Sequence, residues 1–410
     1  MKLRKFFPIL LAFLLAFGSF HILIEASKSN GKGNQKESVE VVEPNSSEIE
    51  PLSTNNNGKG NGNGKNNNKT VDSEPAPEKP VVTPEPPVEE ENPTNFMKLG
   101  YYTKYWTTDL TSYHSLTSYH SYMNAIATAS YDVTANGTIE GFDPKEGVDF
   151  ANANGVQPFV TVQNKFDPSL ANRILSDSKL RETTIMNMLE LVKSKGYKGI
   201  NLNFENMLAS DRAHFNQFVK ELVDVFHANE YPVIVSVPAK TGDFPTWAWS
   251  GTFEYKVLGE LADYIQLMSY DQHGSWGTPG PVAGADWVEN VLKYATSEIP
   301  SEKLLIGLPA YAYDWNLTNS TKNRALTWKN VQALIETTKA IVQWNSTVQS
   351  PYFEYTESNG DKHIVWFENE KSIEIKTRLV HTYNLGGVSM WRMGQEDEQF
   401  WKAIEKGLYH

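Results

Sequence analysis

The sequence contains no cysteine, and it also lacks a net positive charge. Without cysteine the chain cannot form disulfide bonds, a cysteine-ligated zinc site or a thiol nucleophile. Its 37 basic and 49 acidic side chains give a formal net charge of -12, whereas binding to nucleic acid normally requires a basic surface. We therefore expect no nucleic acid as the main partner, although an acidic balance alone identifies no substrate.

The composition is that of a folded protein. The chain has 410 residues, of which 40% are hydrophobic and 12% aromatic, enough for a sizeable core in one large domain or two medium ones. A core of that size can also replace disulfide bonds in a secreted protein.

Residues 1–26 have the layout of an export signal. Basic residues at positions 2, 4 and 5 precede an apolar run from Phe6 to Ile24, as in secretory signals. The run is also long enough to span a bilayer as an uncleaved anchor, since about 20 apolar residues suffice. We expect an extracytoplasmic protein, secreted or membrane-tethered, located in the cell wall or spore.

Residues 27–95 have the composition of a tether. The segment begins with tracts such as "NNNGKGNGNGKNNNK" and ends with "PEPPVEEENP". Glycine and asparagine predict a flexible chain, while proline and like charges predict an extended one. We interpret it as a disordered linker that precedes a domain formed by residues 96–410.

From Phe96 onward the sequence alternates between strand-like and helix-like stretches. Eight strand-like runs are present: "KLGYYTKYW", "MNAIATASYDV", "VQPFVTVQN", "GINLNFE", "YPVIVSVPA", "DYIQLMSYD", "KLLIGLPAYAY" and "LGGVSMWRMG". Residues 209–231 predict a helix, with an apolar face of Phe215, Phe218, Val219, Leu222, Val223 and Phe226. Residues 183–197 predict another, with Met186, Leu189 and Val192 on its apolar side. Such alternation indicates a parallel sheet.

The fourth run places three polar side chains on one face. Asn201, Asn203 and Glu205 alternate with apolar residues in "GINLNFE". A parallel strand has no watery side, and burying unpartnered polar groups costs about 1–3 kcal/mol each. A closed eight-stranded barrel, with these groups pointing inward, explains the pattern. The alternative, a half-exposed antiparallel strand, lacks hairpin turns on either side. Glu205 would lie at the strand's C-terminal end, where barrel enzymes place catalytic groups.

The sixth run repeats this pattern. Gln266, Met268 and Tyr270 share a face of "DYIQLMSYD", and Asp271 follows. A hydroxyl and carboxylates beside aromatic rings suit a sugar, which has apolar faces and polar edges. Aromatic residues near the ends of other runs fit the same idea, although singly such residues are more often core or scattered surface. They are Tyr101, Trp106, Trp247, Trp276, Tyr313, Trp315 and Trp391. Trp391, on the last strand, is the best candidate.

These motifs resemble glycoside hydrolase family 18, the chitinase-like barrels. The family's fourth-strand pattern Asp-Gly-x-Asp-x-Asp-x-Glu corresponds to "KGINLNFE", and "QLMSYD" and "GGVSMWRMG" are similar to its sixth and eighth strands. The resemblance runs from Phe96 to the C-terminus. The segment from His363 to Trp401 resembles most closely the bacterial branch of spore-cortex and cell-wall peptidoglycan N-acetylglucosaminidases. The third strand has "VTVQNKF" where ordinary chitinases have "SxGG", which also favours that branch.

The resemblance implies a TIM (β/α)8 barrel and a substrate-assisted retaining mechanism. Glu205 would be the general acid and base, with its pKa raised by burial, and Asn203 and Tyr270 would complete the catalytic group. The substrate-binding residues would be Asn201, Tyr101, Gln266, Met268, Asp271 and Trp391. No metal or organic cofactor is implied. Asn203 stands where the family has aspartate, so we expect positioning of the acetamide to survive and charge stabilisation to be lost.

Two further expectations concern architecture and function. Residues 314–368 interrupt the alternation and resemble the small α+β insertion between strands 7 and 8; an ordinary excursion with a hairpin at "ESNGDK" is the alternative. The leading function is a glycosidase that cuts β-1,4 bonds at N-acetylglucosamine, in peptidoglycan rather than chitin. The competing functions are a catalytically weak sugar-binding protein, favoured by Asn203, and a structural spore-coat component.

Overall fold

The structure is a computed structural model that describes residues 96–410. The expected export signal or anchor at residues 1–26 and the expected linker at residues 27–95 lie outside the described residues. Within the described part, no helix is both long and apolar enough to cross a membrane.

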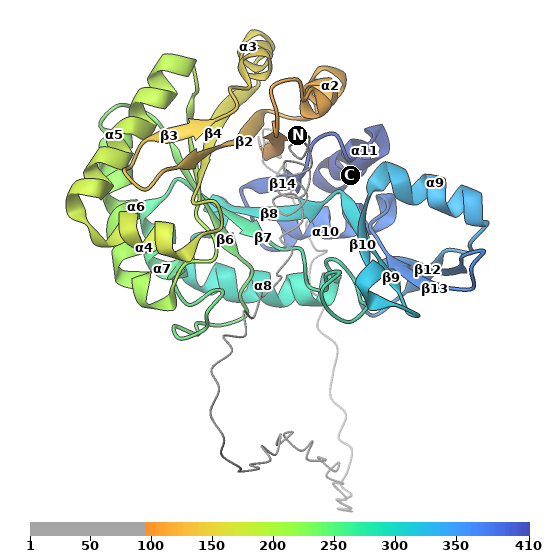
Figure 1. Cartoon of the computed structure of the whole chain (residues 1–410). Coiled ribbons are helices and arrows are strands. Elements are labelled where there is room, and N and C mark those ends of the chain that lie inside the picture. Colours follow the sequence, from red (N-terminus) through yellow and green to blue (C-terminus); the bar gives the residue numbers. More distant parts are fainter. Residues whose placement is uncertain (1–95) are drawn as a thin grey trace, which may run out of the picture. The chain divides into compact units, whose positions relative to one another are not determined.

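The core of the fold is a closed barrel of parallel strands, as the sequence predicts (Figure 1). Its strands are β1 (Met97–Thr103), β2 (Ala125–Val133), β4 (Gln157–Gln163), β5 (Gly199–Asn203), β6 (Val233–Pro238), β7 (Tyr264–Met268), β8 (Leu304–Pro309) and β14 (Gly387–Trp391). The barrel closes because β1 pairs in parallel with both β14 and β2. A short strand, β3 (Ile139–Gly141), pairs antiparallel with the end of β2. We call the end at which the parallel strands finish the barrel mouth.

Helices surround the barrel on the outside (Figure 1). They are α2 (Thr111–Tyr119), α3 (Lys145–Ala153), α4 (Pro168–Ser176), α5 (Ser178–Lys195), α6 (Arg212–His227), α7 (Tyr255–Leu261), α8 (Ala285–Glu298), α10 (Glu370–Thr382) and α11 (Glu398–Tyr409). All six apolar residues predicted for the buried face of α6 are buried. This continuous apolar face fixes the helix against the sheet.

The prediction of the buried face of α5 is partly wrong. Leu189 and Val192 are buried, but Met186 is 50% exposed, and its place is taken by Ile185 and Met188. The helix begins at Ser178, well before the stretch used for the prediction, and its buried positions recur at three- and four-residue spacing along the whole length. Met186 lies off that stripe. The predicted stop is present, because Gly196 adopts the left-handed conformation with φ 76°.

An α+β insertion lies between the seventh and eighth barrel strands, as predicted. It contains β9 (Tyr311–Asn316), β10 (Arg324–Thr327), α9 (Trp328–Thr338), β11 (Gln343–Asn345), β12 (Ser350–Thr356) and β13 (Lys362–Trp366). Its strands form a second, antiparallel sheet in the order β10-β9-β13-β12-β11. The hairpin expected at "ESNGDK" joins β12 to β13 inside this insertion. The run "KLLIGLPAYAY" therefore divides at Ala310 between two sheets.

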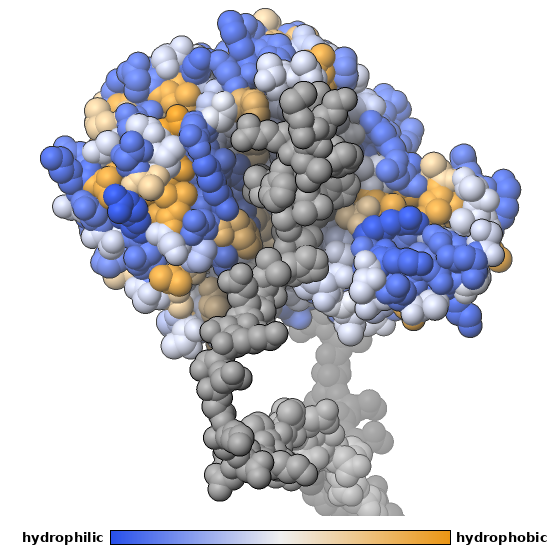
Figure 2. Space-filling view, viewed as in Figure 1, coloured by the Kyte–Doolittle hydropathy of each residue, from blue (hydrophilic) through white to orange (hydrophobic). Residues whose placement is uncertain are grey.

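Two clusters of apolar side chains, one outside the barrel strands and one inside the barrel, hold the strands that carry the site. A large cluster of apolar side chains fills the space between the barrel strands and the helices, and it includes Ile200, Leu202 and Phe204 of the fourth run. A smaller cluster, with Leu99, Tyr101 and Phe159, lies inside the barrel. On the outer surface seen in Figure 2, hydrophobic groups stand among hydrophilic ones over the barrel, as is usual for a protein surface in water.

Candidate active site

Glu205 lies at the barrel mouth, two residues after the end of β5. The outward residues Ile200, Leu202 and Phe204 are fully buried under the helices, so the alternation of the strand turns the polar residues inward. The side chain of Asn164, which directly follows β4, forms two hydrogen bonds with the backbone of Glu205. Its Oδ1 accepts from the Glu205 N–H at 2.8 Å, and its Nδ2 donates to the Glu205 carbonyl at 2.8 Å.

The environment of Glu205 raises the pKa of its carboxyl group toward neutrality. Its side chain is only half-buried, yet protein surrounds it closely enough that desolvation is the main cause that raises its pKa to about 7. A hydrogen bond of 3.0 Å from Asn203 Nδ2 to Glu205 Oε1 lowers the pKa, and the charge of Asp271 raises it. A carboxylic acid with such a pKa can serve as a general acid and a general base at neutral pH.

Asn203 offers a free acceptor beside this acid. The residue is 5% exposed, and its Oδ1 is buried with no hydrogen-bond partner among residues 96–410. Because burying an unpaired carbonyl costs free energy, this atom is available for an N–H donor of a bound molecule. Asn203 therefore donates to Glu205 with one end of its amide and keeps the other end for a ligand.

Asp271 is held by the insertion. Tyr311 and Tyr313, both on β9, donate hydrogen bonds to Asp271 Oδ1 at 2.6 and 2.9 Å. Desolvation raises the pKa of Asp271, and the two tyrosine hydroxyls oppose that rise. Since the charge of Asp271 also raises the pKa of Glu205, the insertion contributes to the electrostatics of the barrel mouth.

Tyr270 and Trp391 provide aromatic surface from the ends of two strands. Tyr270 is half-buried, and its ring lies 6.3 Å from that of Tyr311. Gly307 on β8 makes room for it, because an added Cβ would lie 2.8 Å from Tyr270 Cε1 and 2.3 Å from the Leu267 carbonyl. Trp391 is half-buried and 5.5 Å from the ring of Tyr101. Both side chains keep exposed surface that a sugar could contact.

Three of the residues expected to bind substrate lie beneath the site. Tyr101, Asn201 and Gln266 are at most 2% exposed. The Tyr101 hydroxyl lies 3.1 Å from Asn201 Oδ1 and 3.3 Å from Gln266 Oε1, and Asn201 Nδ2 donates to Ser236 Oγ at 2.9 Å. Their polar atoms satisfy one another inside the barrel, so this arrangement supports the layer above it. Met268, also predicted to bind substrate, is half-buried.

The other predicted aromatic residues fall into two groups. Trp106, Trp247 and Trp276 are between 48% and 57% exposed, in loops that follow barrel strands. Tyr313 and Trp315 are buried in the insertion. Tyr313 donates a hydrogen bond to Asp271 and Trp315 donates to the backbone of the same loop, and neither side chain has exposed surface for a substrate.

Sequence reasoning did not identify Asn164, Gly307 or Tyr311. Asn164 is the last residue of the run "VQPFVTVQN", and a polar residue at the end of a barrel strand is a signal that could have identified it. Gly307 and Tyr311 have no such signal, because their roles depend on contacts with β7 and Asp271 across the fold.

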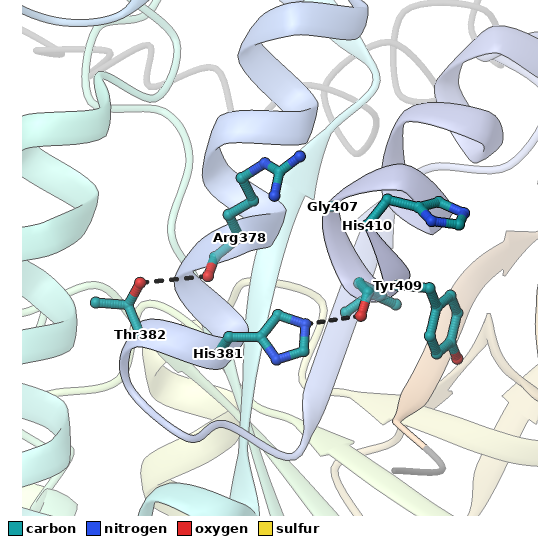
Figure 3. A pocket seen from close by; sticks show the side chains of 7 residues that line it. Arg378, His381, Thr382, Gly407, Tyr409 and His410 are labelled. Carbon is teal, nitrogen blue, oxygen red and sulfur yellow. Dashed lines mark hydrogen bonds between the residues drawn. The ribbon is translucent and has the colours of Figure 1, made fainter. Parts of the chain in front are cut away.

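Two cavities lie at the end of the barrel opposite to the mouth. One is between α10 and α11 (Figure 3), where His381 Nε2 lies 2.7 Å from the Leu408 carbonyl. The second is lined by residues that begin strands, among them Met97, Gln157 and Tyr264. Catalytic groups of such barrels gather at the mouth, so neither cavity is the candidate active site. A metal-compatible group of side chains, Glu357, Asp361 and His363, lies in the insertion.

A barrel with a proton-donating carboxyl group at its mouth, beside an acceptor and aromatic surface, has the arrangement of a glycoside hydrolase. The family Glycosyl hydrolases family 18 matches residues 97–396, and the chain belongs to that family.

Relatives of this chain include glycosylases and chitinases. It is 36% identical over 309 residues to the uncharacterized glycosylase YvbX of Bacillus subtilis (strain 168), which covers 74% of this chain and 90% of that protein. It is 28% identical over 290 residues to the cortical fragment-lytic enzyme of the same strain, over 69% of this chain and 67% of that one. The crystal structure of a chitinase from Chromobacterium violaceum ATCC 12472 superposes with a TM-score of 0.73 at 33% identity, covering 77% of this chain and 99% of the chitinase.

Proposed function

We propose that this family 18 glycoside hydrolase cuts β-1,4 bonds at N-acetylglucosamine in peptidoglycan, outside the cytoplasm. The observation that carries the proposal is the Glu205 carboxyl group at the barrel mouth, with its pKa raised to about 7 beside the unpaired Asn203 Oδ1. The similarity to a cortical fragment-lytic enzyme supports peptidoglycan of the spore cortex or wall as substrate. The apolar run within residues 1–26 supports export or tethering.

Substrate assistance would supply the nucleophile. The carbonyl oxygen of the sugar's 2-acetamido group attacks the anomeric carbon while Glu205 donates its proton to the glycosidic oxygen, which leaves with the bonding electron pair. The resulting oxazolinium ion is then opened by water, and Glu205, now a carboxylate, takes the proton from that water. A pKa near 7 suits both steps, because the same group must release and regain a proton near neutrality.

Asn203 and Tyr270 would orient the acetamide. Asn203 Oδ1 accepts the acetamide N–H, which gives the buried oxygen the partner that the described chain does not supply. The Tyr270 hydroxyl binds the acetamide carbonyl, and Trp391 packs beneath the sugar ring. Tyr101, Asn201 and Gln266 hold this layer in place through their buried hydrogen bonds.

A sugar-binding protein without activity is the second candidate, because Asn203 cannot stabilise the cationic intermediate with a charge. A lectin has no use for a carboxyl group whose pKa is about 7, so Glu205 favours the enzyme.

The test uses the full chain and Glu205→Gln, each incubated with purified cortex peptidoglycan, vegetative peptidoglycan and chitin oligomers. Mass spectrometry of the soluble products should show new N-acetylglucosamine reducing ends from peptidoglycan with the wild type only. Equal product yields from the two proteins would leave sugar binding as the function. Products from chitin oligomers but not from peptidoglycan would contradict the substrate assignment.

A further inference from the structure

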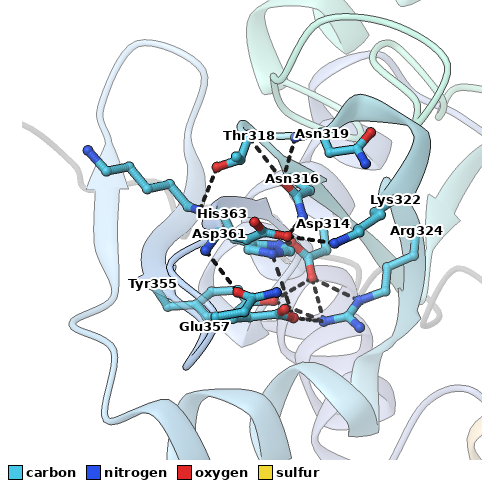
Figure 4. A network of polar contacts seen from close by, with 12 residues as sticks. Asp314, Asn316, Thr318, Asn319, Lys322, Arg324, Tyr355, Glu357, Asp361 and His363 are labelled. Atoms are coloured by element: carbon cyan, nitrogen blue, oxygen red, sulfur yellow. Dashed lines mark hydrogen bonds and ion pairs between the residues drawn. The ribbon is translucent and has the colours of Figure 1, made fainter.

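The insertion contains a polar cluster far along the chain from the catalytic residues (Figure 4). Glu357 and Asp361 lie in the turn between β12 and β13, and His363 lies on β13. One ligand-type atom from each residue lies within 4.8 Å of the other two. Close carboxylates are common on protein surfaces without any ligand, so the position of the histidine decides whether the cluster is a site.

His363 is held with one ring nitrogen directed at the carboxylates. The residue is 3% exposed, and its Nε2 has no hydrogen-bond partner among the described residues. The nearest carboxylate atom to that nitrogen is Glu357 Oε1, at 3.6 Å. Leaving a buried ring nitrogen unpaired costs free energy. A cation between His363 and Glu357 would remove that cost.

The other ring nitrogen has the partner that metal-binding histidines usually have. His363 Nδ1 lies 2.8 Å from Oδ1 of Asp314, which is fully buried on β9. A carboxylate on the far nitrogen fixes the orientation of the ring and makes the facing nitrogen a better ligand. The free lone pair of Nε2 then points toward Glu357 and Asp361.

The charges of the surrounding side chains favour binding of a cation. Asp361 Oδ2 is already bound by Lys322 Nζ at 2.8 Å and by Asn316 Nδ2 at 2.9 Å, which leaves its Oδ1 for a further ligand. Arg324 pairs with Asp314 Oδ2 at 2.9 Å and lies 3.8 Å from Glu357. The carboxylates of Asp314, Glu357 and Asp361 thus face two cationic side chains, so the cluster has a residual negative charge when His363 is neutral.

We propose that Glu357, Asp361 and His363 bind a divalent transition-metal ion, for which Zn²⁺ is the best match. One imidazole and two carboxylates are ligands that zinc accepts, whereas calcium prefers six to eight oxygens. In a tetrahedral zinc site with bonds of about 2.1 Å, the ligand atoms lie about 3.4 Å apart, whereas the three atoms here lie within 4.8 Å of one another. The two carboxylates must therefore move inward. Both are partly exposed in a turn, so this movement needs no change in the core. The bound ion would join the hairpin turn to β9 through His363 and Asp314.

Isothermal titration calorimetry tests the site, with ZnCl₂ added to the untagged full chain after dialysis against a chelator and CaCl₂ as the comparison. We expect about one zinc per chain and no comparable calcium binding. Glu357→Gln and His363→Gln should each weaken zinc binding at least tenfold, because even outer-shell changes commonly cost 10–100-fold in affinity. Glu354→Gln is the matched control. It removes the same charge from an exposed position on β12, and it should bind zinc like the wild type.

Lys322→Met distinguishes a metal site from a network that only stabilises the insertion. Lys322 competes for Asp361, and its side chain is 53% exposed, so the variant should fold and bind zinc severalfold more tightly. An unchanged or weaker affinity would contradict Asp361 as a ligand and with it the three-residue site. No zinc binding by the wild type at millimolar ZnCl₂ would overturn the proposal. Full affinity in the folded Glu357→Gln variant would overturn it as well.

Discussion

Replacing Asn203 with aspartate tests the least usual residue of the site. The change is nearly isosteric, and it converts an amide that donates to Glu205 Oε1 at 3.0 Å into a carboxylate at the same place. In the wild type this donor lowers the pKa of Glu205 and partly opposes the rise due to desolvation. The substitution removes the donor and adds a like charge, and both effects raise the pKa of Glu205.

The size of the effect follows from the geometry. Two charges 3 Å apart interact by about 5 kcal/mol at an effective dielectric of about 20. A proton shared between the two carboxyl groups relieves most of that repulsion, so we expect the pKa of Glu205 to rise by at least about one unit. The rate should also increase. A hydrogen bond to a charged group is worth about 1 kcal/mol more than a neutral one, which corresponds to a roughly fivefold higher kcat.

The assay is the pH dependence of kcat/KM on a soluble oligosaccharide substrate. Glu205 must be protonated to act as the acid, so activity is full below its pKa and declines as the pH rises through it. For the wild type the decline should be centred near pH 7. For Asn203→Asp it should move to higher pH by about one unit or more.

Asn152→Asp is the matched control, because Asn152 is exposed on the outer helix α3 and undergoes the same chemical change. Its pH profile should coincide with that of the wild type. If Asn203→Asp leaves both kcat and the alkaline limb unchanged, the role assigned to Asn203 is wrong.

Three other substitutions have expected outcomes. Glu205→Gln should lower kcat by about 10²–10⁴-fold in the product assay. It should also make the protein more stable at pH 8, as judged by urea denaturation, because the raised folded-state pKa means that wild-type stability is lost as pH rises from about 4.5 to 7. Trp391→Ala should weaken sugar binding by roughly tenfold in calorimetry, about 1.4 kcal/mol, with the pH profile unchanged. Phe218→Ala should reduce the free energy of unfolding by about 3–5 kcal/mol, since its ring is fully buried and stacked 5.7 Å from Phe204; a loss below 1 kcal/mol would contradict tight packing there.

The barrel could be predicted because its signals are local. Alternation along "GINLNFE" fixes which residues face inward, and the same period of two fixes "DYIQLMSYD". All buried apolar residues of α6 were predicted for the same reason, because the spacing of apolar residues in an amphipathic helix shows which face is buried. The prediction for Met186 is wrong because the buried stripe of α5 is defined over 18 residues, and its first turns lie before the stretch with the clearest apolar pattern.

Only those site residues could be predicted whose positions follow from the local sequence pattern. Glu205, Tyr270 and Asp271 follow strands, so their place at the mouth follows from topology. The hydrogen-bond partners of Tyr101, Asn201 and Gln266 could not be predicted, because they are side chains from several strands that meet inside the barrel. The hydrogen bond from Tyr311 to Asp271 joins residues 40 positions apart, one on β9 of the second sheet and the other in the loop after β7, and no local pattern encodes it.

The direct passage from β8 into β9 has a consequence for engineering. Only Ala310 separates the two strands, so no linker segment stands between the barrel and the insertion at that end. Its tyrosines hold a carboxyl group that influences the proton donor. Trimming the insertion to obtain a minimal barrel would therefore shift the working pH of the enzyme. Designers who wish to shift that pH could instead work on Tyr311 and Tyr313 and leave the catalytic strand untouched.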